Sequence, residues 1–490
     1  MEYSPIGLPV SLKYDLPPSI SDSCRSYSVH VNPNGITTLT GPALTATPFV
    51  ANSTGIFGSF TQQVIGFDLP CGNSDSVFLD PSSTTLSFTL TYIVSTASVG
   101  GTGTIMNLIG SGASFFDTLT LFSNNVPLET INMYGLLQNF LLNNTVSKSE
   151  RSGGISVCMG TDDFGSYTGV DLPFGALGTY RINFSIPLLS VIGINCPDKL
   201  FPIGSVNNLQ LQLQTTMNYP IVSYCTVVPT TMPAVSAGFT LSEFSLNLKY
   251  IDVGDVASAM LKQTLQNGKW FIKASTYTNS NVTIPASSSG SQQLLLQIRN
   301  TSVKSIFHTF GLAVSAVTPN GLYDSINPSL SSRQLQIGGS YFPNKPISDI
   351  YRPSEGYINL IQSLGGNIGN KASGTVVDKS IYNMCIPSVI AGSELFCITP
   401  ANGVRSVPSG GDTTELILAK YPSMFYCGYD LERSQGVLFQ GYNTRSTPPF
   451  LNLYLAQSTG AGNTCTCTAW GLSDVVLVFD VASKSVQAMI

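Results

Sequence analysis

Hydrophobic and polar residues alternate with a period of two in many short stretches of this chain. Leu209, Leu211 and Leu213 alternate with glutamines, and the run from Leu86 to Tyr92 alternates apolar side chains with Ser and Thr. Such a pattern is typical of strands that bury one face. In the first half of the chain it predicts strands at 27–31, 62–67, 86–92, 116–122, 182–186 and 209–213.

The second half carries the same signal. The stretch 292–349 contains three extended segments, 294–298, 305–310 and 335–337, which we expect to be strands of one antiparallel sheet. Further strands are predicted at 244–250, 270–274, 394–398, 415–418, 437–440, 451–455 and 474–479.

The remaining segments are predicted to be helices, where apolar residues recur at helical spacing, or loops, where the composition is rich in Gly and Ser. Three segments predict short helices, and Pro353 stands in the first turn of the last one. The pair Asn124-Asn125 predicts a tight turn after a strand. Gly- and Ser-rich composition predicts long loops. The helices are expected at 131–143, 256–265 and 351–364, and the loops at 97–112 and 147–178.

The two halves share an order of elements. In each, a strand is followed by a turn, a proline (Pro127 or Pro343) and a helix, although no residue string repeats. The segment 227–238 has two prolines and small residues, as an interdomain linker would. Each half then holds about eight strands, the number in a jelly roll. The predicted domains are an arm at 1–26, a first jelly roll at 27–230, a linker at 231–238, and a second jelly roll with a C-terminal tail at 239–490.

The amino-acid composition indicates whether the surfaces of these domains face water or other protein chains. A chain of 490 residues is long enough for two or three domains. Only 10% of its residues are charged, against roughly 25% in typical soluble proteins. This favours an obligate assembly of copies, with a secreted β-protein coated by Ser, Thr and Asn as the alternative. The net charge of −5 argues against general nucleic-acid binding, which requires basic patches.

The ten cysteines are scattered, which does not fit a disulfide-built scaffold. Cys465 and Cys467 form the one tight pair, but only His30 and His308 could add imidazole ligands, so we expect buried free thiols. The oxidation state of this pair stays open. The N-terminal sequence is not that of a signal peptide, and no run approaches the roughly 20 apolar residues of a membrane span. We therefore expect synthesis in a reducing, intracellular compartment.

The sequence has few of the residue patterns that are typical of enzyme active sites. The chain lacks HExxH, GxSxG and P-loop motifs. The glycine-rich segment 97–104 has no following Lys and predicts a loop. His308 lies beside Phe307 and Phe310, which predicts a satisfied core histidine rather than a catalytic base. Asp162-Asp163 predicts a solvated turn more than a cation site. We expect no enzyme activity and no catalytic, cofactor or metal-binding residue, a cupin-like or glycosidase-like enzyme being the least favoured alternative.

Several motifs resemble those of double jelly-roll major capsid proteins, the lineage of adenovirus hexons, tectivirus-like phages, virophages and polinton-like viruses. RNTSVKSIF (299–307) and RQLQIGGSYFPNKPI (333–347) look like parts of the second barrel. FDTLTLFSNNVPLETINMYGLLQNFL (116–141) is similar to a strand–turn–helix of the first barrel. FSIPLLS (184–190) and FTLSEFSLNLKYIDV (239–253) resemble its later strands and the link to barrel two. The similarity covers most of 60–365, and long tower insertions are missing, so the virophage and polinton-like members look most similar.

This resemblance implies an all-β fold of two consecutive eight-stranded jelly rolls with a few short helices in loops. It implies a structural protein of a DNA virus: a homotrimeric, pseudo-hexameric capsomer in an icosahedral virion, made in the host cytoplasm or nucleus. Its expected partners are neighbouring capsomers, penton proteins and minor capsid proteins, with contact to an internal membrane left open. The alternative is a secreted or surface β-sandwich binding module of the adhesin or lectin kind.

In this lineage the N-terminal arm lies at the base of the capsomer. Here Lys13 and Arg25 are outnumbered by acidic residues, so no basic cluster supports DNA binding. We expect no direct sequence-specific contact with nucleic acid. The arm should instead pack under neighbouring subunits through alternating apolar side chains, as an added edge strand. These side chains are Ile6, Leu8, Val10, Leu12 and Tyr14.

Overall fold

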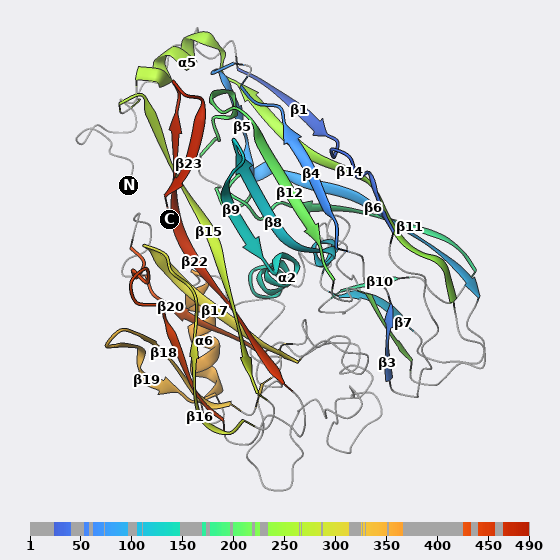
Figure 1. Ribbon diagram of the computed structural model, residues 1–490, viewed down its shortest axis with the longest axis vertical. Coiled ribbons are helices and arrows are strands. Elements are labelled where there is room, and N and C mark those ends of the chain that lie inside the picture. The colour runs from blue at the N-terminus through green and yellow to red at the C-terminus, as the bar shows by residue number, and fades with distance from the viewer. Residues whose placement is uncertain are drawn as a thin grey trace, which may run out of the picture.

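The chain forms two β-barrels that lie side by side (Figure 1). The structure is a computed structural model. It describes residues 24–40, 53–57, 62–72, 74–96, 105–109, 111–147, 169–172, 177–196, 199–217, 221–225, 234–263, 265, 267–285, 288–312, 325, 327–328, 330–349, 352–365, 425–432, 440–455 and 464–489.

The first barrel consists of two antiparallel sheets. Sheet 1A has the strand order β1-β14-β6-β11, with the short strands β2 and β5 also paired to β14, and sheet 1B has the order β4-β12-β8-β9. The strands of sheet 1A are β1 (Arg25–Val31), β2 (Thr38–Thr40), β5 (Val77–Leu79), β6 (Thr85–Thr96), β11 (Gly178–Pro187) and β14 (Ala234–Asp252). Those of sheet 1B are β4 (Val64–Leu69), β8 (Phe116–Ser123), β9 (Val126–Asn132) and β12 (Leu209–Thr215).

The second barrel repeats this plan. Sheet 2A has the order β15-β22-β17-β20, with β23 also paired to β22, and sheet 2B has the order β16-β21-β18-β19. The strands of sheet 2A are β15 (Lys269–Ile284), β17 (Val303–Leu312), β20 (Tyr426–Asp430), β22 (Cys465–Asp480) and β23 (Ser485–Met489). Those of sheet 2B are β16 (Gly290–Leu295), β18 (Leu330–Ile337), β19 (Ser340–Ile347) and β21 (Phe450–Leu455).

Both barrels have the strand order of a jelly roll. If the main strands of each barrel are numbered along the chain, the A sheet runs 1-8-3-6 and the B sheet runs 2-7-4-5. The predicted double jelly-roll architecture is therefore confirmed. A further small sheet, β10-β7-β13-β3, lies beside the first barrel. Its strands are β3 (Ser53–Phe57), β7 (Ile105–Ile109), β10 (Gly169–Leu172) and β13 (Ile221–Cys225).

Alternation along the strands builds the cores. In β12 the leucines are buried and the glutamines are partly exposed, so each side chain takes the face that its position in the period predicts. The turn between β8 and β9 is formed by Asn124 and Asn125, both with positive φ (49° and 63°), a backbone that asparagine tolerates well. The predicted turn at these two residues is confirmed.

Three helices connect the strands in the described part of the chain: α2 (Tyr134–Thr145), α5 (Gly254–Gln263) and α6 (Pro353–Ser363). Three short 3-10 turns, η2 (Pro81–Ser83), η3 (Gly112–Phe115) and η5 (Ile203–Ser205), belong to loops. Helix α6 packs closely on β20 because Gly428 has no side chain. A Cβ atom at this position would overlap the side chain of Ser363. All three predicted helices are found, and Pro353 is at the start of α6 as expected.

The predicted domain boundary was wrong. Strand β14 pairs with β1 and β6, so it is the last strand of the first barrel and not the first strand of the second. Phe239, Leu241 and Leu246 point into the first core because they are buried and lie opposite Tyr92, Leu90 and Leu86. Residues 234–238 of the predicted linker are thus part of β14, and α5, between β14 and β15, connects the barrels. Arg25 and Ser26, assigned to the arm, already belong to β1, while 1–23 lie outside the described residues.

Several other predictions from the sequence differ from the structure. The three extended segments expected in one sheet are split, because β16 and β18 belong to sheet 2B and β17 to the facing sheet 2A. Strands β9 and β19 occupy the positions between the two turns and the following helices, where no strand was predicted. The predicted loops contain strands β7 and β10. The predicted strands 394–398 and 415–418 lie outside the described residues, as does 437–440 except Gln440.

Candidate functional surfaces

The two histidines lie in different barrels. His30 is exposed on β1, and its Nδ1 lies 2.7 Å from Asn247 Oδ1 in a hydrogen bond. His308 is completely buried on β17, where it stacks on Tyr429 and meets Phe310 edge-on. Neither ring nitrogen of His308 has a hydrogen-bond partner among the described residues. The predicted core position is confirmed, but the expectation of a satisfied imidazole was wrong.

Burial holds His308 in its neutral form. Desolvation lowers the pKa of the imidazole well below its usual range, and the positive charge of Arg333 lowers it further. An imidazole enclosed in this way has no contact with solvent or substrate. We therefore assign it to the core of the second barrel and not to catalysis.

The other candidates from the sequence do not form a chemical site. Cys465 and Cys467 are buried free thiols on β22, as predicted. Burial raises the pKa of Cys465 to about 12, so its reactive thiolate is scarce at neutral pH. In the described ranges, no group of three or more His, Cys, Asp or Glu side chains could hold a metal ion. Asp162-Asp163 and the segment 97–104 lie outside those ranges.

A buried ion pair stands inside the second barrel. Arg333 Nε donates a hydrogen bond of 2.9 Å to Asp349 Oδ2, and both side chains are inaccessible to solvent. The Arg333 guanidinium also lies 5.3 Å from the centre of the Tyr429 ring. Since Arg333 belongs to β18 and Tyr429 to β20, this contact joins the two facing sheets. Arg333 lies in the same alternation as Leu335 and Ile337, which was the only signal of its burial in the sequence.

Helix α2 of the first barrel is part of the junction with the second barrel. The ring of Phe140 packs against Phe307 and Trp470 of sheet 2A, at centroid distances of 5.3 and 6.1 Å. It also meets Tyr426 edge-on at 5.0 Å, and Asn143 Nδ2 donates to Tyr426 Oη at 3.1 Å. Almost every side chain of α2 is buried, including those of its polar residues Gln138, Asn139, Asn143 and Asn144. The apolar spacing of the segment predicted a helix but did not reveal this partner.

Glu129 is a second link across the junction. This carboxylate on β9 is completely buried and accepts hydrogen bonds from Ser190 Oγ (2.6 Å), Val191 N (2.9 Å) and Thr276 Oγ1 (2.8 Å). Thr276 belongs to β15 of the second barrel, so the carboxylate binds donors from both barrels. Desolvation raises the pKa of Glu129, and the hydrogen bonds oppose that shift. Sequence patterns alone gave no sign of this contact.

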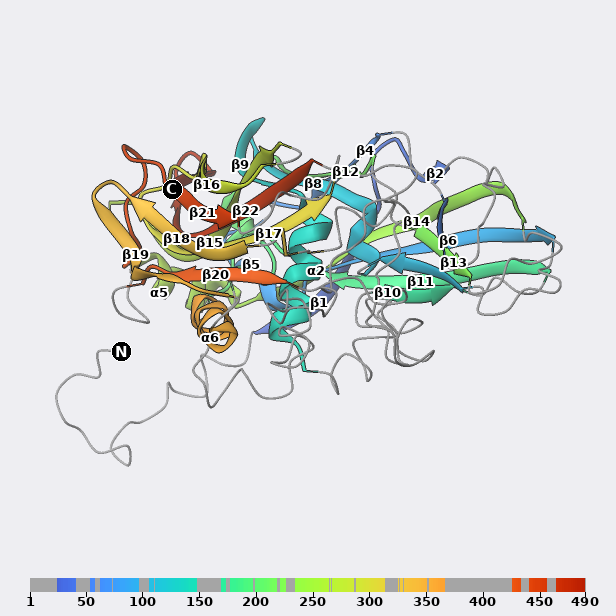
Figure 2. The same cartoon turned by 90° about the horizontal axis from the view of Figure 1, so that it is seen from below.

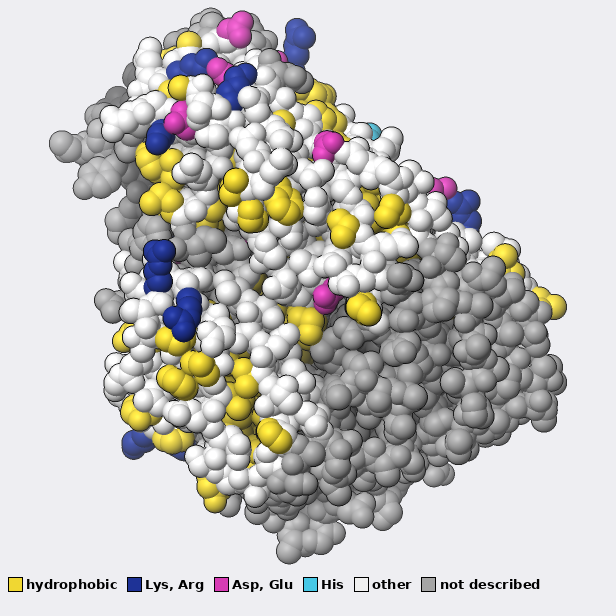
Figure 3. All heavy atoms as spheres, in the orientation of Figure 1, with side chains coloured by type: hydrophobic (Ala, Val, Ile, Leu, Met, Phe, Trp, Pro, Cys, Tyr) yellow, Lys and Arg dark blue, Asp and Glu magenta, His cyan; other side chains and the backbone are white. Residues whose placement is uncertain are grey.

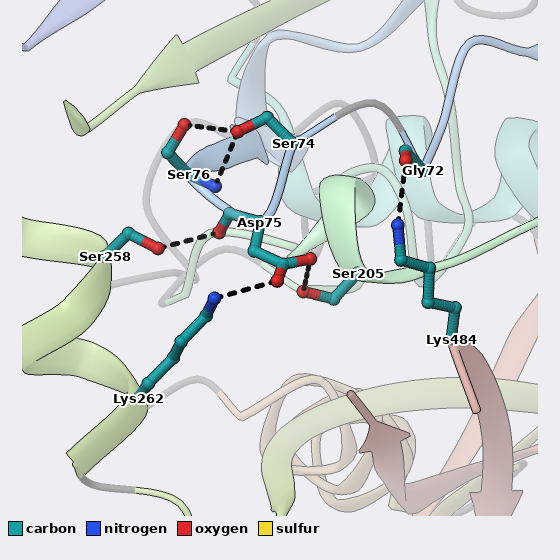
Figure 4. A network of polar contacts seen from close by, with 8 residues as sticks. All are labelled: Gly72, Ser74, Asp75, Ser76, Ser205, Ser258, Lys262 and Lys484. Atoms are coloured by element: carbon teal, nitrogen blue, oxygen red, sulfur yellow. Dashed lines mark hydrogen bonds and ion pairs between the residues drawn. The ribbon is translucent and has the colours of Figure 1, made fainter. Parts of the chain in front are cut away.

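A third set of contacts between the barrels lies at the end of the molecule that carries α5 (Figure 4). Lys262 of α5 forms an ion pair of 2.8 Å with Asp75, and Ser258 Oγ donates to the backbone oxygen of Asp75. In the turn after β22, Lys484 Nζ donates to the backbone oxygen of Gly72 at 3.0 Å. Loops of the first barrel thus hold both the connecting helix and the last hairpin of the second barrel.

Charge is unevenly distributed over the surface. Figure 3 shows Lys, Arg, Asp and Glu side chains gathered around the α5 end, and few of them over the rest of the described surface in that view. Exposed hydrophobic side chains occur on sheets of both barrels, among them Val64, Val126, Tyr341 and Tyr454. No helix in the described segments is long and apolar enough to cross a membrane.

Comparisons with known proteins agree with this geometry. The sequence matches no protein-family model and no curated protein. Among solved structures, the PBCV-1 virus capsid matches with a TM-score of 0.52 and 12% identity, over 96% of this chain and 97% of that one. The Faustovirus major capsid protein gives 0.52 and 10%, over 93% and 91%. The mavirus major capsid protein gives 0.51 and 11%, over 100% and 94%.

The chain has the fold of double jelly-roll capsid proteins. The likeness spans nearly the whole length of both chains, so it includes both jelly rolls and the junction between them. At 10 to 12% identity it concerns the fold and not individual residues. The double jelly-roll resemblance suggested by the motifs is therefore confirmed at the level of fold.

Proposed function

We propose that this chain is a viral major capsid protein that forms a homotrimeric capsomer. One observation carries the proposal: two jelly rolls of identical strand order are held side by side by a buried junction. Three copies would supply six similar barrels, which can form a nearly hexagonal block that tiles a shell. The capsid names of the structurally similar proteins and the low charge of 10% support the same assignment.

The rigidity of the junction matters for this role. A tile must keep the relative orientation of its two barrels, or neighbouring tiles would not meet in register. Phe140, Glu129 and Lys484 link the barrels at three separate places, by ring packing, buried hydrogen bonds and a backbone contact. Such a scaffold suits a structural subunit. Within the described residues, no group of three or more His, Cys, Asp or Glu side chains could form a catalytic metal centre.

The finer parts of the proposal concern partners and location. We infer contact with neighbouring capsomers, penton proteins and minor capsid proteins in an icosahedral virion, after synthesis in the host cytoplasm or nucleus. The arm before Cys24 would pack beneath neighbouring subunits without binding DNA. Contact with an internal membrane is compatible with this arrangement.

Light scattering and electron microscopy of the purified protein test the capsomer. We expect the mass of three chains and particles with a nearly hexagonal outline, each chain losing more than ~1,000 Å² of surface to its neighbours. A protein that stays monomeric at micromolar concentration and gives no trimer in microscopy would refute the proposal. Deleting residues 1–20 should leave trimers intact and impair shell assembly.

A further inference from the structure

The outer faces of sheets 1B and 2B carry similar rows of hydrogen-bonded carboxamide side chains. On sheet 1B, Gln212 Nε2 donates to Gln210 Oε1 at 2.9 Å, and Gln210 Nε2 donates to Asp68 Oδ1 at 2.9 Å. On sheet 2B, Gln293 Nε2 donates to Asn452 Oδ1 at 3.0 Å, and Asn452 Nδ2 donates to Gln336 Oε1 at 3.1 Å. In each barrel the amides link neighbouring side chains in a row. We call these two surfaces the amide faces.

Charged side chains are scarce on the strands that form the amide faces. Among the strands of sheets 1B and 2B, only Asp68 and Lys345 carry exposed charges, while Glu129 and Arg333 are buried and Asp117 is half-buried. The A sheets differ: Arg181 and Glu243 form an exposed ion pair on sheet 1A. A protein surface that meets only water normally carries many more charges than the amide faces do.

Large exposed side chains accompany the amides. Tyr341 and Tyr454 on the sheet 2B strands are 44% and 53% exposed, and Val64 on β4 of sheet 1B is 44% exposed. Tyrosine is enriched at protein interfaces because its ring buries a large area and its hydroxyl still finds a hydrogen bond. Both faces therefore offer apolar area as well as hydrogen-bonding groups.

The arrangement of the barrels turns the two faces toward one side of the molecule. In Figure 2, β4, β12, β8 and β9 of the first barrel lie above β6 and β11, and β16 and β21 of the second lie above β20 and α6. The other side of sheet 2A is already covered within the chain, because α2 packs on Phe307 and Trp470. Among the described residues, the amide faces and the outer face of sheet 1A remain open to solvent, and only the amide faces are poor in charge.

We infer that the amide faces are the contact surfaces between copies of this chain in neighbouring capsomers. A carboxamide is both donor and acceptor, so an amide face is complementary to a second amide face without any matching of charges. Because both barrels carry such a face, the first barrel of one copy is able to meet either barrel of another. Polar, hydrogen-bonding contacts are typical of interfaces between preformed units, whereas permanent subunit interfaces are more apolar.

This inference rests on the proposed capsid function, and the experiment separates the two. Lysines would be placed at the centre of each face in the double variant Gln212→Lys/Asn452→Lys. The matched control Asn183→Lys replaces an exposed amide of β11 on sheet 1A. Trimer formation would be measured by light scattering, and shell formation by sedimentation and electron microscopy.

We expect the double variant to form trimers as the unaltered chain does, and to lose shell assembly at least ten-fold at low salt. High salt should restore part of the assembly, since it screens the repulsion between lysines that meet across the contact. The control should assemble normally. Normal shells from the double variant, or loss of its trimers, would overturn the inference. If the unaltered chain fails to form trimers, the proposed function itself is wrong.

Discussion

The two barrels have one strand order but different interiors. In the first barrel Phe88 stands at the centre of an aromatic cluster, with four other phenylalanine rings at centroid distances of 5.1 to 6.0 Å. These rings belong to Phe115, Phe116, Phe184 and Phe244. In the second barrel the corresponding space holds polar groups: the Arg333–Asp349 pair and the neutral His308 beside Tyr429.

This difference shows that the jelly roll does not depend on one kind of core. The alternation of buried and exposed positions specifies which side chains point inward, and either chemistry can fill the space. The energetic consequences differ, however. An aromatic core loses stability mainly when volume is removed. A polar core loses stability when one partner is removed or when a proton is added, because a charge is then left buried.

The largest effect is expected from Phe88→Ala in the first barrel. It removes a large buried side chain and its ring contacts, which should lower the free energy of unfolding by about 3–5 kcal/mol. Urea unfolding followed by tryptophan fluorescence would measure the change, since Trp270 packs on Phe78 and Trp470 on Phe140, both residues of the first barrel. A loss below about 1 kcal/mol would mean that the aromatic cluster is not the centre of this core.

In the second barrel, Arg333→Met should cost about 3 kcal/mol, because it leaves Asp349 buried without its cation. The double variant Arg333→Met/Asp349→Leu removes both charges and should recover most of that loss. Thermal unfolding of the single and double variants in parallel would measure the coupling between the two positions. Additive losses would show that the ion pair does not act as a unit.

The smallest effect is expected in the dependence of folding stability on pH. The pKa of His308 is lower in the folded chain than in the unfolded chain, so below pH ~6.5 the unfolded state takes up the extra proton. Stability should then fall with decreasing pH, by at most about 1.4 kcal/mol per unit for this group. His308→Phe should reduce that slope in unfolding experiments between pH 7 and pH 5. Parallel curves for the variant and the unaltered chain would exclude His308 as the source.

The sequence alone determined most of the local structure. The alternation at Leu209–Leu213 and Leu86–Tyr92, the Asn124-Asn125 turn and the three helices depend on neighbouring residues and were predictable for that reason. The fold class followed from the number of strands and from the motifs. Strands β9 and β19 were missed because Pro127 and Pro343 are poor strand residues, tolerated here on strands at the edges of their sheets.

Tertiary structure decided what depends on residues far apart in the chain. Strand β14 belongs to the first barrel because its backbone pairs with β1 and β6 and its apolar face packs into that core, whereas the composition around 227–238 looked like a domain linker. Glu129 meets Thr276, and Phe140 meets Trp470, across more than a hundred residues. A period of two tells which side chains point inward, but not which sheet a strand joins or which barrel it faces. Those choices depend on the packing of whole sheets, and so does the alignment of the two amide faces.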